Sequence, residues 1–231
     1  MKNKRLWLVG FVAAIALIYA GCSSSPEKAL LDKYFHALSM SDNQTMAAMA
    51  VEPLAIEAES YEIISISEEK VEPVILPELN KKEMEAKKAV EDHIGPVVDA
   101  KDALDTAKYD LDNARTSGAR AALKRKVAEL QAKYDEEYNI HTELQKQYTE
   151  AKEAAAKEEQ ITLFSLNVQA LPGVRDLQGD VHSKEVLIKV KTKAGTERQY
   201  NVLLRKYVLK DDAGQTLNGR WIIVKFVPVS G

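Results

Sequence analysis

The stretch VVDAKDALDTAKYDL (residues 97–111) places its apolar side chains at alternating spacings of three and four residues. The repeated positions are Val97, Ala100, Leu104, Ala107 and Leu111. An α-helix has 3.6 residues per turn, so side chains at this spacing form a narrow stripe along one helical face. A stripe that keeps an average period of 3.5 residues is typical of a left-handed coiled coil, in which a second helix covers it.

The same spacing continues on both sides of this stretch. Residues 78–160 contain only Gly95, Gly118 and Pro96 as helix-disfavouring residues, and they are rich in Ala, Glu, Lys, Asp and Leu, a composition typical of long helices. The predicted seam comprises Ala86, Val90, His93, Val97, Ala100, Leu104, Ala107, Leu111 and Ala114, and then Leu123, Val127, Leu130, Tyr134, Glu137, His141, Leu144, Tyr148, Ala151 and Ala155.

A reversal of the chain near Thr116-Ser117-Gly118 would bring the two halves of this seam together. Leu111 would then face Leu123, and the small Ala100 would face the large Tyr134, which suits close packing at a fixed distance. We therefore predict one antiparallel coiled-coil hairpin over residues 78–160, with its tip near residues 116–119. At 1.5 Å per residue, its arms would be about 50–60 Å long. The hairpin could also pair with a partner protein or with a second copy of itself.

One part of the seam is polar. His93 would face His141, Glu137 precedes His141 by one turn, and Gly95-Pro96 lies just after His93, where we expect a kink. Three interpretations stay open for this layer: it fixes the register of the arms, it acts as a pH-sensitive joint, or it binds a metal ion through His93, His141 and Glu137.

The residues before the hairpin predict two helices and a strand. Ser25 can cap a helix that has Pro26 at its first position, with an apolar face formed by Leu31, Tyr34, Phe35 and Leu38. Ser41-Asp42-Asn43-Gln44 has the spacing of a capping box and begins a second helix, which we expect Pro53 to end. The isoleucine-rich residues 61–67 predict a strand.

Residues 161–231 predict four antiparallel strands joined by short connections. Alternating apolar residues define the first three, namely Phe164, Leu166 and Val168; Val186, Ile188 and Val190; and Tyr200, Val202 and Leu204. The fourth is formed by Trp221, Ile222, Ile223, Val224 and Phe226. Ala194-Gly195-Thr196 is a tight hairpin connection, and residues 211–219 form a longer turn.

Helix, helix, strand and then antiparallel strands is an order similar to that of the nuclear transport factor 2-like fold. The opening segment ALLDKYFHALSMSD (residues 29–42) and the run Gly219-Arg220-Trp221-Ile222-Ile223 resemble that family's first helix and last strand. The resemblance implies an α+β domain formed by residues 26–77 and 161–231, with a curved antiparallel sheet packed on the N-terminal helices. The hairpin stands where the family has its third helix. A cystatin-like or unrelated α+β sheet fits the same order of elements.

The N-terminal residues predict a secretory signal peptide. Basic Lys2, Lys4 and Arg5 precede 14 apolar residues (6–19), which are fewer than the roughly 20 that cross a bilayer, and Ala20-Gly21 follows as a small-residue cleavage site. The run from Ile18 to Ser25, with the chain's only cysteine at position 22, resembles the lipobox of bacterial lipoproteins, although Tyr19 stands where leucine is usual.

The lipobox resemblance implies cleavage between Gly21 and Cys22, an acyl-bearing lipid on Cys22 and a short tether over residues 22–25. The protein would then be anchored in the bacterial cell envelope and face the periplasm. Ser23, where aspartate is a retention signal for the inner membrane, favours the outer membrane. Two or three acyl chains hold a protein to a membrane almost permanently.

Charge and motifs exclude several function classes. Cleavage would remove three of the 32 Lys plus Arg residues and none of the 35 Asp plus Glu, so the mature net charge is about −6. This balance argues against nucleic acid or anionic lipid as the main partner. The chain has no phosphate-binding loop, nucleophile elbow or dinucleotide glycine motif, and we expect no cofactor and no catalytic residues.

Three hypotheses for the function follow. The first is a non-enzymatic envelope lipoprotein that uses its coiled coil as an interaction or spacer module. The second is a module that binds a small apolar ligand in the concave face of the sheet. The third is a pocket enzyme of the isomerase or dehydratase kind found in the resembling superfamily, for which Asp32, Tyr34 and His36 are poor candidates because residues two apart on a helix point in different directions.

Overall fold

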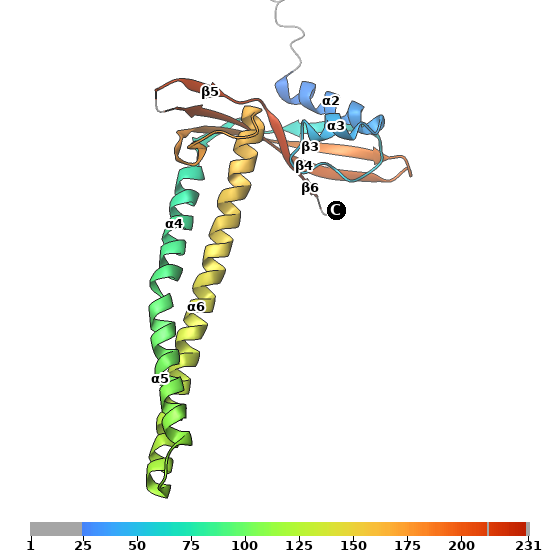
Figure 1. The fold of residues 1–231 in the computed structure, drawn as a ribbon. Helices are drawn as coiled ribbons and strands as arrows, with labels where there is room; N and C mark the ends of the chain where they lie inside the picture. Colours follow the sequence, from blue (N-terminus) through green and yellow to red (C-terminus); the bar gives the residue numbers. More distant parts are fainter. Residues whose placement is uncertain (1–24, 212, 230–231) are drawn as a thin grey trace, which may run out of the picture. The chain divides into compact units, whose positions relative to one another are not determined.

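The structure, a computed structural model, describes residues 25–211 and 213–229 (Figure 1). It is an α+β protein whose six strands form one open antiparallel sheet. The strand order is β1-β3-β4-β5, while β2 also pairs with β3 and β6 with β4. The described residues divide into two compact units: unit 1 contains residues 25–67, 185–204 and 221–229, and unit 2 contains residues 68–184, 205–211 and 213–220. Strands β3 (Gln178–Thr192) and β4 (Glu197–Lys210) each contribute to both units.

Unit 1 begins with the two predicted helices. Helix α2 (Pro26–Ser39) is capped by the Ser25 hydroxyl, which accepts a hydrogen bond from the Lys28 amide, as its sequence predicts. Helix α3 (Asn43–Ala47) is shorter than predicted and ends well before Pro53. Its cap is Asp42, whose carboxylate accepts from the Thr45 amide at 3.0 Å, and not Ser41.

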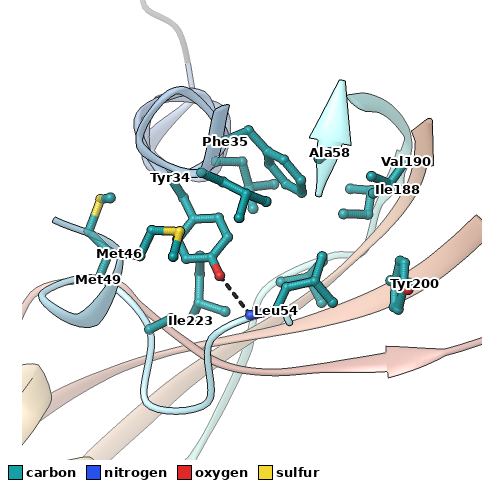
Figure 2. Packing of buried hydrophobic residues seen from close by; sticks show 14 of the residues in the cluster. Tyr34, Phe35, Met46, Met49, Leu54, Ala58, Ile188, Val190, Tyr200 and Ile223 are labelled. Carbon is teal, nitrogen blue, oxygen red and sulfur yellow. Dashed lines mark hydrogen bonds between the residues drawn. The ribbon is translucent and has the colours of Figure 1, made fainter. Parts of the chain in front are cut away.

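The core of unit 1 lies between these helices and strands β1 (Ala58–Ile66), β3, β4 and β6 (Ile222–Pro228). The predicted helical face is buried, because Leu31, Tyr34, Phe35 and Leu38 are at most 9% exposed. Figure 2 shows Tyr34 and Phe35 among Met46, Ile188, Val190 and Ile223. The Leu54 amide donates to the Tyr34 hydroxyl at 2.8 Å, so this buried oxygen keeps a partner.

Unit 2 contains the long helices. Helices α4 (Leu76–Asp92) and α5 (Ile94–Asp112) follow one another and both pack along α6 (Ser117–Leu166) (Figure 1). We call α4 with α5 the first arm and α6 the second arm, and the two arms together the helix pair. Every residue of the predicted seam is buried or half-buried. Of the other residues between positions 86 and 155, all except Ala89 and Gln131 are exposed.

The interruption predicted at Gly95-Pro96 is a break between two helices. Helix α4 ends at Asp92, and α5 begins at Ile94, so Pro96 stands in the first turn of a new helix. A proline there costs little, because its missing N–H would have no partner within that helix. The sequence therefore predicted the place of the distortion, and the structure puts the break at His93, which is itself a seam residue.

The strand predicted at Phe164, Leu166 and Val168 is wrong. Residues up to Leu166 belong to α6, and Asn167 ends the helix in the left-handed conformation at φ 59°. The buried residues of this last turn are Ile161, Thr162 and Ser165, which are spaced for a helix. Two of them are polar, so the helical period was hidden from a reading of hydrophobic residues alone.

Two short strands were not predicted. Strand β2 (Lys70–Pro73) pairs antiparallel with the beginning of β3, and β5 (Thr216–Asn218) pairs with the end of β4, within the stretch predicted as a long turn. The tight connection at Gly195 is confirmed, with φ 81°. The three strands predicted around Ile188, Val202 and Ile223 are also confirmed.

We predict that the protein loses stability at alkaline pH, because the pKa values of three tyrosines are raised in the folded state. Burial raises the pKa of Tyr34, Tyr61 and Tyr207, and the hydrogen-bonded carboxylates of Asp32 and Glu158 raise the last two further. Above about pH 10 the unfolded chain loses tyrosine protons that the folded chain keeps, so the free energy of unfolding should fall as the pH rises. Urea denaturation across this range should show the fall, and Tyr207→Phe should make it shallower; an unchanged slope would contradict this.

Candidate interaction site: the helix pair

The polar layer predicted in the middle of the helix pair forms. Nε2 of His93 lies 3.1 Å from a carboxylate oxygen of Glu137, and the rings of His93 and His141 stack with their centroids 5.9 Å apart. Nε2 of His141 also lies 3.0 Å from the amide nitrogen of Gln145. The Nδ1 atoms of both histidines are buried and make no hydrogen bond. The layer therefore joins the two arms at the point where α4 ends and α5 begins.

These residues do not form a metal centre in the structure. Stacked imidazole rings do not direct two nitrogens at one point, and no group of three or more His, Cys, Asp or Glu side chains in residues 25–211 and 213–229 is arranged to hold a metal ion. Among the three interpretations from the sequence, the contacts favour a polar layer that fixes the register of the two arms.

We call the end of the helix pair opposite the α5–α6 turn its root. A residue that the sequence analysis missed contacts both arms there. Arg175, in the short helix η1 (Val174–Asp176), contacts Glu83 of α4 at 2.6 Å and Glu159 of α6 at 2.7 Å. Its hydrogen bond to Glu159, with that to Glu83, raises the pKa of the Arg175 guanidinium. The neighbouring Asp176 accepts from the Asn80 amide at 2.9 Å. One short segment thus holds both arms.

A second polar cluster at the root is buried. The Tyr207 hydroxyl donates to the Glu158 carboxylate at 2.6 Å, and Nη1 of Arg205 donates to the same carboxylate at 3.2 Å and to the Tyr207 oxygen at 3.1 Å. Burial alone would lower the pKa of Arg205, but Tyr207 and Glu158 outweigh it and the pKa is raised. The cluster fixes α6 to β4.

A cavity of about 360 Å³ adjoins this cluster. Glu158 and Arg205 line it, together with Glu72, Glu78 and an apolar wall formed by Pro73, Val74, Ile75 and Val181. Glu158 and Arg205 satisfy one another, so their polar atoms are engaged in holding the fold. The charged groups that line the cavity are therefore one structural ion pair, Glu158–Arg205, and two further carboxylates, Glu72 and Glu78.

Near the end of α6, Ser165 connects the helix to the chain that follows β5. Its hydroxyl donates to the Arg220 carbonyl at 2.8 Å and accepts from the Tyr207 amide at 3.1 Å. The Arg220 amide returns a bond to the Ser165 carbonyl at 2.8 Å. These contacts explain why a serine is fully buried in a helix.

Asp32, Tyr34, His36 and His182 do not belong to the helix pair. The Tyr61 hydroxyl donates to the exposed carboxylate of Asp32, while Tyr34 points into the core and His36 is exposed. The side chains of Asp32, Tyr34 and His36 therefore lie in different surroundings. His182 lies in a different place, with Nδ1 2.6 Å from Glu69, and this contact, with that from Lys184, lowers the pKa of Glu69.

The predicted lipidation and cleavage residues, Gly21 and Cys22, lie outside the described residues. Within the described part of the chain, no helix is both long and apolar enough to cross a membrane. Comparisons with protein-family models, with curated proteins and with solved structures found no match.

Proposed function

We propose that this protein is a bacterial lipoprotein, anchored by a lipid on Cys22, whose antiparallel coiled-coil hairpin is a non-enzymatic interaction or spacer module. The observation that carries this proposal is the continuous seam of buried and half-buried residues along the helix pair from Ala86 to Ala155. A seam with a period of 3.5 residues and charged flanks is what a coiled coil requires. Such a rod has a fixed length and an exposed polar surface, which suits reach and contact rather than catalysis.

The surrounding elements support this reading. Arg175 contacts both arms, and the Glu158–Arg205–Tyr207 cluster joins α6 to β4, so the hairpin would have a fixed base within unit 2. We also propose a nuclear transport factor 2-like fold for the flanking α+β part, on the packing of α2 and α3 against the strands of unit 1. One face of the sheet in unit 1 is covered by α2 and α3 through this buried core, so we prefer the interaction module to the ligand-binding and enzyme alternatives.

The lipid anchor can be tested at Cys22. Cells that express the full chain and grow with radioactive palmitate should label the wild-type protein, because an acyl chain joins the mature N-terminus. Cys22→Ser should remove the label and release the protein from the envelope membranes, while Met49→Leu, an unrelated substitution of similar size, should change neither. An unlabelled wild-type protein would refute the anchor.

The role of the hairpin can be tested by shortening it. Residues 87–147 would be replaced by the sequence of the native turn, residues 113–116. Ala86 and Tyr148 would then flank the new turn, and Glu83, Glu158 and Glu159 would stay in the chain. We expect this variant to fold, to stay lipid-anchored and to lose function in a deletion strain. If the shortened protein complements the deletion fully, the hairpin is not the functional module. Sedimentation of both proteins would show whether the hairpin also self-associates.

A further inference from the structure

The turn between α5 and α6 is strongly basic in a chain that is acidic overall. Residues 113–128 contain five cationic side chains and no acidic one. The cations are Arg115, Arg120, Lys124, Arg125 and Lys126, and all five are exposed. We call residues 113–128 the basic tip.

The cations of the basic tip are not neutralised within the described part of the chain. None of the five forms an ion pair there, and the only side-chain bond made by any of them is a long one, 3.4 Å, from Arg120 to the Ala114 carbonyl. The nearest acids on α5 are Asp110 and Asp112. Even with both included, residues 109–128 carry a net charge of +3. The net charge of the whole chain conceals this local field.

The basic tip and the root are the two opposite ends of the helix pair. Glu158 and Ser165 of α6 contact the strands of unit 2, whereas the tip lies at the opposite end of the same helix (Figure 1). The 42 residues from Ser117 to Glu158 span about 60 Å at 1.5 Å per residue. A cluster of cations at the end of a rod is placed for contact with a surface.

The other residues of the basic tip decide the class of partner. Leu123 and Val127 are seam residues, and the remaining side chains are Asn, Ala, Thr, Ser and Gly. Hot-spot residues of specific protein interfaces are most often Trp, Tyr and Arg in well-packed, desolvated positions, and single-stranded nucleic acids are held by stacking on aromatic rings. The basic tip has no aromatic residue, and its three arginines are exposed among small side chains. Its cations also occupy successive positions around the helix, as at Lys124, Arg125 and Lys126, and so they match a diffuse field of negative charge rather than a shaped cleft.

We propose that the basic tip docks on a lipid surface that carries anionic headgroups. Each Lys or Arg near such a surface strengthens binding by about fivefold, so a few clustered cations give appreciable attachment without any apolar insertion. This inference names a partner for the interaction module and rests on that proposed function. The protein would then link its own lipid anchor to a second, anionic bilayer surface.

The test uses the full lipidated protein in donor vesicles of phosphatidylcholine, which offer the tip no anionic lipid. Acceptor vesicles of phosphatidylglycerol should cluster with the donors, and acceptors of phosphatidylcholine should not. The variant Lys124→Gln, Arg125→Gln, Lys126→Gln leaves the turn itself untouched and should weaken clustering by about a hundredfold, at about fivefold for each cation. Salt should weaken the wild-type clustering as well, because the Debye length is about 10 Å at 0.1 M.

A matched control removes the same charge elsewhere on the helix pair. Lys81→Gln, Lys87→Gln, Lys88→Gln changes three exposed lysines of α4, whose ion pairs lie along one helix, and should leave clustering unchanged. Circular dichroism should show the same helix content for both variants. Equal clustering by the two variants, or clustering without anionic lipid, would overturn the proposal. Flotation tests the lipid anchor separately from the docking of the basic tip. If the protein does not float with the donor vesicles, the lipid anchor is refuted. The same protein can then be mixed directly with phosphatidylglycerol vesicles, which tests the tip without the anchor.

Discussion

Glu158→Ala is expected to lower the free energy of unfolding by about 3 kcal/mol, towards the lower end of the range for breaking a buried ion pair on one side. Glu158 is 7% exposed, and its carboxylate accepts hydrogen bonds from Tyr207 and Arg205. Its removal leaves a largely buried guanidinium without its counter-charge and a buried phenol without its acceptor. Arg205 keeps about a quarter of its side chain exposed, which moderates the loss. Urea denaturation of the purified protein measures the effect.

Two further substitutions show that the carboxylate is responsible. Glu158→Gln keeps the size of the side chain and an oxygen for Tyr207, so only the loss of charge beside Arg205 should remain and the cost should be smaller. Glu150→Ala changes an exposed glutamate of the same helix and should alter stability by less than about 0.5 kcal/mol. If Glu158→Ala also stays within that range, the cluster does not fasten α6 to β4.

The seam of the helix pair was predictable because it depends on local periodicity. The positions from Ala86 to Ala155 repeat over many turns, and the place of the reversal then determines which residues face each other, as His93 and His141 do. Both pieces of information are present in consecutive sequence. A long repeat also averages over single exceptions, such as the polar Glu137.

The root of the helix pair was not predictable, because its signals are polar and distant. Ser165, Thr162 and Glu158 are buried in the last turns of α6, where polar residues usually indicate an exposed face. Each is satisfied by a bond to the backbone or to a residue far along the chain, and Arg175 reaches back to Glu83 across 92 residues. Hydrophobic alternation at Phe164 and Leu166 therefore predicted a strand in place of a helix end.

The basic tip could be recognised only from the sequence and the fold together. The sequence shows five cations between residues 113 and 128, but the net charge of the whole chain argued against an anionic partner. Only the placement of that segment at the end of the long helices separates its charge from the acidic residues elsewhere. A local field at the end of a rod acts on a partner within about one Debye length, whatever the sum over the whole molecule.

The second large effect is expected at Gly179, at the start of β3. A Cβ atom built there would lie 2.2 Å from the Val208 carbonyl oxygen and 2.8 Å from the Cα of Leu209, distances that real side chains do not adopt. Both obstacles are backbone atoms of β4, and the Gly179 carbonyl accepts from the Val74 amide at 2.9 Å, so neither strand can withdraw without losing hydrogen bonds. Gly179→Ala should therefore lower the free energy of unfolding by about 3 kcal/mol, at the upper end for overpacking.

Gly118→Ala is the matched control for this prediction. Gly118 is the second residue of α6, and nothing lies within 4 Å of the Cβ position there. Alanine restricts the unfolded chain and favours the helix, so this substitution should raise the free energy of unfolding by up to about 1 kcal/mol. Thermal and urea denaturation of the two variants should therefore move in opposite directions from the wild type. If Gly179→Ala leaves the free energy of unfolding unchanged or raises it, the close approach of β3 and β4 at Gly179 does not limit the residue that can stand there.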